Sequence, residues 1–255
     1  MPQGIPPRPA GNALADLYNE HFEVVPVRTP ALLDKVYRLR YQVYCIEHNF
    51  EPRSENLAAR EIDRYDCHSV HSALIHKSSG EVVGTVRLIL PTADGGDDDL
   101  PIRALLGPEA RRQIDRFPRI RTAEISRYAV SKLFRQRRGE HRYADVDPDP
   151  GTQVDERRIM PYVTLGLMRA VIEMALANDI EYLFAVMEPT LIRLLLRFGL
   201  RFDPVGPLIE YHGARQPAVI TPHRMVESLG RRRLDYWRAG PAHHDEPGET
   251  FRRAS

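Results

Sequence analysis

The sequence is poor in cysteine, with only Cys45 and Cys67 among 255 residues. A framework of disulfide bonds is therefore not expected, and a reducing compartment fits best. Long hydrophobic runs are missing too, because Leu191–Leu196 is interrupted by Arg193 and is too short to span a bilayer. Residues 1–13 contain no apolar stretch of the kind that a signal peptide needs. These absences predict a cytoplasmic protein.

An excess of charge of one sign is also missing. The chain has 36 Lys and Arg against 35 Asp and Glu, a formal net charge of +1, so nucleic acid is not expected as a partner. The 10 histidines show no metal-ligand spacing, and no metal is predicted. The charge that is present lies in patches, one of which contains Arg135, Arg137 and Arg138. Each patch taken alone is most simply a solvated surface.

The ends of the chain differ in composition from its middle. Residues 1–20 and 239–255 are rich in proline and glycine, so we expect an arm and a tail without fixed structure. One domain is expected over residues 21–238, because a chain of this length can bury one full core. Its first elements are an edge strand over 22–28 that contains Pro26, and a helix capped by Thr29. Residues 69–76 and 82–90 flank a glycine-containing turn and predict a hairpin.

The second half of the domain continues the alternation. We expect a strand over 124–130, a buried helix over 161–177, a strand over 182–187, a helix from Pro189 to a cap at Gly199, and a closing hairpin of 207–211 with 218–220. Residues 135–157 are too rich in proline for a helix and predict a polar insertion. This order predicts an α/β protein with a mixed sheet in one three-layer domain, rather than a doubly wound parallel sheet.

Charged residues occur inside segments that are otherwise apolar. Arg40 and Tyr44 are four apart and share a helix face, and Arg87 lies in an apolar strand. On the strand over 124–130, simple alternation puts Glu124, Ser126 and Tyr128 on one face and Arg127 on the other. Buried charges are costly unless they are paired or used. We therefore expect a buried ion network formed by Arg40, Arg87, Arg127, Asp63, Asp66 and Glu124. Taken alone, such a network is as often structural as catalytic.

Four motifs occur in a fixed order: Arg-x-x-x-Tyr, Asp-x-x-Asp, Gly-x-x-Arg-Leu-x-x-Pro and Glu-x-Ser-Arg-Tyr. Together they resemble the acyl-homoserine-lactone autoinducer synthases and the long-chain N-acyl amino acid synthases, over residues 22–225. The whole chain most resembles the bacterial acyltransferases associated with the PEP-CTERM/exosortase system. The resemblance implies a GNAT-like three-layer α/β/α fold with a mixed, V-shaped central sheet. Phe50, where the autoinducer synthases usually have tryptophan, and the insertion over 143–156 weaken lactone synthesis in particular.

The resemblance implies transfer of a fatty acyl group from a thioester to the amine of an amino acid or similar small acceptor. Such an attack needs a neutral amine, and Glu124 is the expected base; the alternative is that Glu124 only pairs with an arginine. The other residues implied as catalytic are Arg127, Arg40, Asp63, Asp66 and Arg87. Those expected to bind substrate are Tyr44, Phe50, Ser126, Met168, Phe184 and Val186. The acyl chain is expected between the strands over 124–130 and 182–187, where Leu183, Ala185 and Met187 are further candidates for its lining.

The donor is the next question. Residues 136–141 match a coenzyme A phosphate loop only in part, whereas an acidic acyl carrier protein suits Arg135, Arg137 and Arg138. We therefore expect an acyl-phosphopantetheine thioester on a carrier protein as co-substrate, with coenzyme A less favoured and no permanently bound cofactor. Any membrane contact is expected through the lipid product only. The alternatives are a lactone synthase, a coenzyme A-dependent acetyltransferase, an acyl-ligand binding module, and an acyl-cysteine route through Cys45 or Cys67.

Overall fold

The computed structural model describes residues 18–53, 58–92, 96, 99–132 and 156–232. Its centre is an eight-stranded sheet in the order β1-β2-β3-β4-β5-β8-β6, with β7 paired to β8. The strands are β1 (Phe22–Pro26), β2 (Ser69–His76), β3 (Glu81–Ile89), β4 (Thr122–Val130), β5 (Tyr182–Met187), β6 (Asp203–Pro204), β7 (Ile209–Glu210) and β8 (Ala214–Ile220). Among the strands in these described ranges only β4 and β5 pair in parallel, so the sheet is mixed as predicted.

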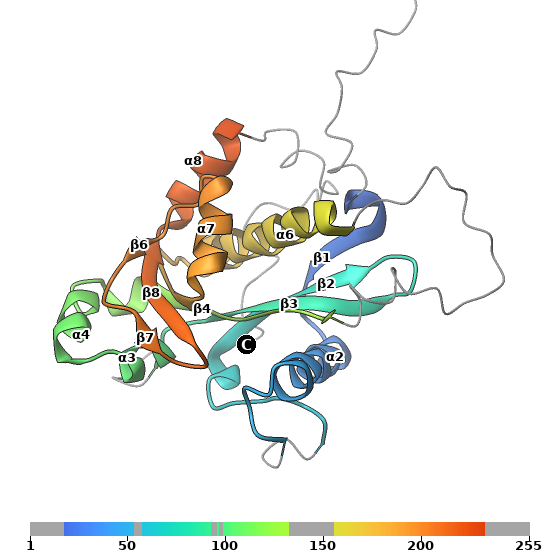
Figure 1. The fold of residues 1–255 in the computed structure, drawn as a ribbon, viewed down its shortest axis with the longest axis horizontal. Coiled ribbons are helices and arrows are strands. Elements are labelled where there is room, and N and C mark those ends of the chain that lie inside the picture. Colours follow the sequence, from blue (N-terminus) through green and yellow to red (C-terminus); the bar gives the residue numbers. More distant parts are fainter. Residues whose placement is uncertain (1–17, 54–57, 93–95, 97–98, 133–155, 233–255) are drawn as a thin grey trace, which may run out of the picture.

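Helices cover both faces of this sheet (Figure 1). On one side lie α6 (Glu156–Ala177), α7 (Pro189–Arg197) and α8 (Pro222–Arg232), and on the other lies α2 (Pro30–Arg40). A π-helical segment, η1 (Tyr41–Glu47), continues α2. The segment between β3 and β4 contains α3 (Pro101–Leu105), α4 (Pro108–Ile114) and the short helix η4 (Arg119–Arg121), and η3 (Asp66–His68) precedes β2. The predicted three-layer α/β/α arrangement is confirmed.

Local sequence signals account for the N-terminal elements. Thr29 Oγ1 accepts a hydrogen bond from the Leu32 N–H at 3.2 Å, and Pro30 occupies the first turn of α2. Pro26 lies in β1, which forms one edge of the sheet and, in the part of the chain that the structure describes, pairs with β2 alone. Gly80 closes the β2–β3 turn at φ +66°, a conformation that glycine adopts without steric cost. The predicted edge strand, helix cap and hairpin are all confirmed.

The main core lies between the sheet and α6. Leu165, Leu167, Val171 and Ile172 on α6 are each at most 1% exposed and pack in one cluster with the apolar face of the sheet. Each such side chain contributes about 1.5–3 kcal/mol when it leaves water. Gly199 at φ +85° ends α7 as predicted. A rigid, well-packed sheet therefore positions the residues of β4 and β5.

Several expected boundaries differ from the structure. Helix α6 begins at Glu156 rather than at residue 161, so the predicted insertion ends earlier. Helices α3, α4 and α8 are not among the predicted elements. Tyr18 falls within the expected N-terminal arm, yet it is 4% exposed and stacks on Phe22. No helix in the described part of the chain is long and apolar enough to cross a membrane.

β4 contains a bulge that changes which side chains share a face. Arg127 has φ +47°, and the β3–β4 register shifts between Thr85 and Arg87. The extra residue turns Arg127 toward the α2 side, where it meets Glu61, while Tyr128 points to α6 and donates to Thr164 Oγ1 at 2.9 Å. The predicted alternation of Ser126, Arg127 and Tyr128 is therefore wrong, because it assumed a regular strand.

β4 and β5 part along their length. Their parallel pairing covers Thr122–Ile125 of β4 and Tyr182–Ala185 of β5, and it ends there although both strands continue. On its other edge β5 pairs with β8 from Leu183 through Met187, so β5 continues in the sheet beyond its last contact with β4. The sheet thus divides beyond Ile125 and Ala185, which confirms the V shape expected for it.

Candidate active site

A buried ion network lies between α2 and the sheet. Arg40 is 0% exposed, and its guanidinium donates to Glu61 at 2.5 Å and to both oxygens of Asp66 at 2.6 and 3.0 Å. Arg87, 1% exposed, donates to both oxygens of Asp63 at 2.6 and 2.9 Å. It also donates to Asp66 at 2.8 Å. These two-oxygen contacts fix the planar guanidinium groups in orientation as well as position.

Arg127 joins this network from the bulge of β4. It contacts Glu61 at 2.8 Å, Asp63 at 3.0 Å and Glu51 at 3.1 Å, and it lies over the Tyr44 ring, 5.2 Å from its centroid. The Tyr44 hydroxyl donates to the backbone carbonyl of Tyr128 at 3.1 Å. Tyr44 therefore holds both the bulge and the guanidinium that the bulge presents.

The carboxyl groups of the network are held ionised. Burial alone would raise the pKa of Glu61, but Arg40 and Arg127 outweigh burial and hold that pKa below its usual value. At Asp63 and Asp66 burial also acts to raise the pKa, but the neighbouring arginines lower it by more, and the pKa of each carboxyl group is below its usual value. The network is therefore charged at neutral pH, with attraction balancing the cost of desolvation.

The carboxylates of this network differ from the prediction. Arg40, Arg87, Arg127, Asp63 and Asp66 are brought together as expected, but Glu124 is not among their partners, and Glu61 and Glu51 are. Among the described residues Glu124 makes no ion pair, and its Oε2 accepts the backbone N–H of Ile102 at 2.8 Å. The alternative in which Glu124 only pairs with an arginine is thus not what the structure shows.

Glu124 is a buried carboxyl group with an altered pKa. It is 3% exposed, and burial raises its pKa to about 8, although the Ile102 N–H bond acts in the opposite direction. Strongly shifted carboxyl groups in clefts are candidates for proton transfer. Glu124 also lies on β4 one residue before the strand separates from β5.

The open part of the V forms a cleft of about 520 Å³. Its polar side contains Glu124, Arg127, Asp63, Arg87, Ser126 and Tyr44, all predicted site residues. Its apolar side includes Ile125, Met168, Val186, Met187 and Leu191. A cleft with an apolar lining and a few convergent polar groups is the usual form of a small-molecule site.

Other predicted residues lie elsewhere. Arg40 and Asp66 are outside the cleft lining and support Arg87 and Glu61 from behind. Phe184 is 0% exposed and packs edge-on against Phe117, with ring centroids 5.3 Å apart, in the cluster below the sheet. Leu183 and Ala185 are also fully buried in the core. Arg135, Arg137 and Arg138 lie outside the described residues.

The structure adds His48, His212, Tyr211 and Arg215 to the cleft, residues that sequence reasoning did not single out. The two histidines stack on either side of the predicted residue Phe50, at centroid distances of 5.0 and 5.1 Å. Tyr211 and Arg215 belong to the same cleft, and the Arg215 guanidinium lies 5.8 Å from the Phe50 ring centroid. The β7–β8 turn thereby meets the segment after η1 across the cleft, a long-range contact for which the sequence gives no local signal.

Neither cysteine lines the cleft. Cys45 is buried, and burial raises the pKa of its thiol. Cys67 is exposed, and its Sγ lies 3.3 Å from His68 Nδ1. The geometry gives no support to an acyl-cysteine intermediate in this cleft, because the thiol nucleophile would have to reach the acyl group there.

Comparison with known proteins agrees with this geometry. Residues 39–144 match the family described as an acetyltransferase (GNAT) domain. The chain is similar in structure to the acyl-homoserine-lactone synthase LasI, with a TM-score of 0.55, 21% identity, and coverage of 82% of this chain and 93% of that one. The fold is GNAT-like.

Two further solved structures share this GNAT-like fold. FeeM, an N-acyl amino acid synthase from uncultured soil microbes, has a TM-score of 0.53 and 16% identity over 83% of this chain and 96% of its own. BjaI, a coenzyme A-dependent acyl-homoserine-lactone synthase solved with MTA, has a TM-score of 0.54 and 20% identity over 87% and 90%. No curated protein sequence matches the chain. At these identities the likeness establishes the fold and leaves donor and acceptor open.

Proposed function

We propose that the protein is an acyltransferase that moves a long-chain fatty acyl group from a thioester to the amine of a small acceptor such as an amino acid. The observation that supports this most strongly is Glu124, a carboxyl group with a pKa of about 8 at the point where β4 and β5 separate beside an apolar wedge. The proposal assigns the proton transfer, the thioester carbonyl and the lipid tail to this one cleft.

The proposed chemistry begins with the acceptor amine. An α-amino group has a pKa of about 8, close to that of Glu124, so a proton passes between them with little cost in either direction. The neutral amine attacks the thioester carbonyl; a C–N bond forms, and the amine proton goes to Glu124. The C–S bond then breaks, and the thiolate takes that proton from Glu124 to leave as the free thiol, which returns Glu124 to its ionised form.

The intermediate in this reaction bears an oxyanion that needs hydrogen-bond donors. The β4 residues Ser126, Arg127 and Tyr128 follow the last pairing with β5 and line the cleft, and we propose their backbone amides as the donors. Removal of one such donor usually costs about 10²–10³ in rate. The apolar side chains of Met168, Val186 and Leu191 are proposed to hold the acyl chain.

The ion network has a positioning role in this proposal. Arg87 Nε donates to Ser126 Oγ at 2.9 Å, two residues from Glu124, and Arg127 supports the bulge in the same strand. The guanidinium groups thus fix the segment of β4 that carries the proposed base and donors. We propose Arg87, Arg127 and Asp63 as groups at the cleft, with Arg40 and Asp66 acting through them.

The donor is proposed to be an acyl carrier protein, on the prediction from Arg135, Arg137 and Arg138 and on the family resemblance. Coenzyme A and a lactone product are the alternatives, since BjaI is described as a coenzyme A-dependent lactone synthase. The PEP-CTERM/exosortase association rests on the sequence resemblance alone.

The test is direct product analysis. The purified protein is incubated with a long-chain acyl thioester on carrier protein or on coenzyme A. The acceptors offered are amino acids and S-adenosylmethionine, which is bound in a structure of the lactone synthase BjaI. Mass spectrometry is expected to show an N-acyl amino acid that forms fastest from the carrier protein. A lactone product would favour the lactone synthase over the N-acyl amino acid synthase. The absence of acyl transfer from either donor would refute the proposal.

A further inference from the structure

Three arginines line the cleft in the part of the chain that the structure describes: Arg87, Arg127 and Arg215. The first two are occupied within the protein. Arg87 is 1% exposed and bonded to Asp63, Asp66 and Ser126, and Arg127 is held by Glu61, Asp63 and Glu51. A ligand could displace those partners only by leaving carboxylates buried without a counter-charge, which is costly.

Arg215 has a different set of partners. Its Nη1 contacts Glu188 Oε1 at 2.8 Å, and its Nη2 donates to the His212 carbonyl at 2.9 Å. The Arg215 side chain is 12% exposed, whereas that of Glu188 is 53% exposed. Glu188 can therefore return to water at little cost, because exposed ion pairs contribute little free energy. Arg215 is the cleft arginine that a ligand anion can take over.

The surroundings of Arg215 also favour an anion. Glu188 is the residue that precedes the first turn of α7, so the guanidinium lies beside the positive end of that helix. The guanidinium is placed over the Phe50 ring, which restricts its orientation. In the sheet, Arg215 adjoins Gln216, which pairs with Met187 at the open end of the β4–β5 split. An acceptor held there lies at the mouth of the cleft.

We infer that Arg215 binds a carboxylate of the acceptor, so that the acceptor is an α-amino acid or another amine that carries a carboxylate. This inference rests on the proposed function, because it assigns the acceptor end of the same cleft. The planar guanidinium suits a carboxylate in two-oxygen contact. Glu188 occupies that place in the free protein and is exchanged for the acceptor.

The test compares an amino acid with the amine that lacks its carboxylate but is otherwise identical. Arg215→Gln is expected to raise the KM for the amino acid about 10- to 100-fold with kcat largely kept, and to leave the KM for the amine unchanged. Glu188→Gln, a change at an exposed side chain, is expected to lower the KM for the amino acid about 2- to 5-fold by removing the competitor.

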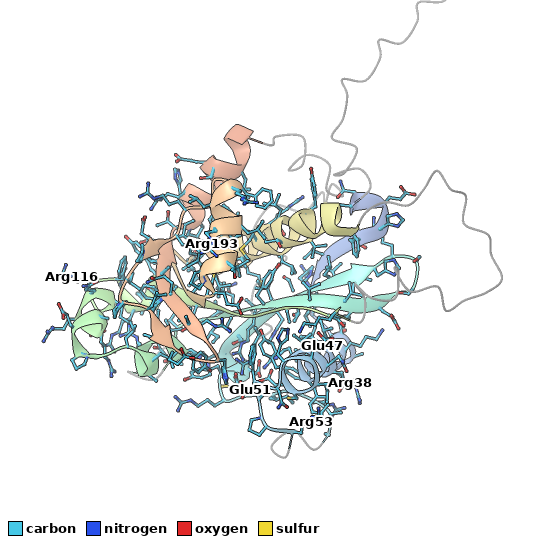
Figure 2. The ribbon with its side chains drawn as sticks, viewed as in Figure 1. Arg38, Glu47, Glu51, Arg53, Arg116 and Arg193 are labelled. Atoms are coloured by element: carbon cyan, nitrogen blue, oxygen red, sulfur yellow. The ribbon has the colours of Figure 1, made fainter. Side chains whose placement is uncertain are left out.

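Arg193 provides the matched control. It is an exposed arginine on α7 that is not among the cleft-lining residues, and Figure 2 shows it on the other side of the sheet from Glu51. Arg193→Gln is expected to change neither KM. Equal effects of Arg215→Gln on the amino acid and the amine, or an unchanged KM for the amino acid, would overturn the inference.

Calorimetric titration separates this inference from the proposed function. If wild-type protein binds the amino acid more tightly than the amine, and Arg215→Gln removes the difference, the carboxylate site stands even where no acyl transfer is detected. If acyl transfer occurs but the titrations show no preference for the carboxylate, the inference fails and the proposed function does not.

Discussion

The backbone N–H of Ile102 donates to Oε2 of Glu124 at 2.8 Å, and this bond joins the short helix α3 to the proposed base. The next residue, Arg103, is 1% exposed and donates to Asp115, which anchors α3 to the end of α4. The bond stabilises the ionised carboxylate, yet burial prevails and the pKa of Glu124 stays at about 8. Glu124 is therefore mostly protonated at pH 7 and becomes a base as the pH rises.

The first prediction concerns the pH dependence of the rate. We expect kcat/KM for acyl transfer to rise about tenfold from pH 7 to pH 9, through an inflection near pH 8, as Glu124 loses its proton. The acceptor amine titrates in the same range, so the measurement uses an acceptor whose amine has a pKa below about 6. A profile that is flat between pH 7 and pH 9 with this acceptor would exclude Glu124 as the titrating base.

The second prediction concerns stability at Glu124. Its pKa is about 8 in the folded protein against an ordinary 4.5, so the folded state holds a proton that the unfolded chain has released. The stabilising effect is complete below pH 4.5 and is lost as the pH rises to 8. Glu124→Gln removes this dependence, and we expect the variant to be more stable than wild type at pH 8, by about a few kcal/mol. Urea unfolding of both proteins at pH 5 and pH 8 measures this difference in the free energy of unfolding. A variant that is no more stable than wild type at pH 8 would contradict the raised pKa of Glu124.

The third prediction concerns the contribution of Arg40 to the stability of the fold. Arg40→Ala leaves Glu61 and Asp66 buried without their shared cation, and we expect a loss of about 3–5 kcal/mol in the free energy of unfolding. Arg38→Ala is the control, since the Arg38–Asp34 pair is an exposed helix contact and its loss should cost less than about 1 kcal/mol. Equal unfolding free energies for the two variants would show that the network does not stabilise the fold.

Part of this architecture was accessible from sequence because its signals are local. The β2–β3 hairpin follows from two β-branched runs around Gly80, and the start of α2 follows from Thr29 and Pro30. Arg40 and Arg87 were recognisable because a charge within an apolar segment requires a partner.

The remainder depends on contacts between distant parts of the chain. The face of Arg127 is set by the bulge in β4, which Tyr44 supports from 84 residues away. Glu61 belongs to the network and Glu124 does not. Glu124 accepts the Ile102 N–H from α3, a helix of 5 residues with no usable periodicity, so the sequence did not indicate this contact. Arg215 enters the cleft through the β7–β8 turn and its contact with Phe50, and no local pattern specifies that contact.

The fourth prediction concerns acyl-chain length. Met168 is a buried α6 residue on the apolar side of the cleft, and Met168→Trp fills part of the proposed acyl site. We expect kcat/KM to shift toward shorter acyl chains, since each methylene contributes about 0.8 kcal/mol when buried. Leu176→Trp, at a 51% exposed position on the same helix, serves as the control and should leave the chain-length profile unchanged. Identical profiles for the two variants would place the acyl chain elsewhere.

The central claim is that Glu124 accepts the proton of an amine that attacks a thioester in this cleft. The most direct measurement is the rate of N-acyl product formation by wild type and by Glu124→Gln, with the same acyl carrier protein thioester and acceptor at pH 8. The account predicts a loss of about 10²–10⁴ in kcat for a variant that remains folded. Equal rates for the two proteins would contradict it.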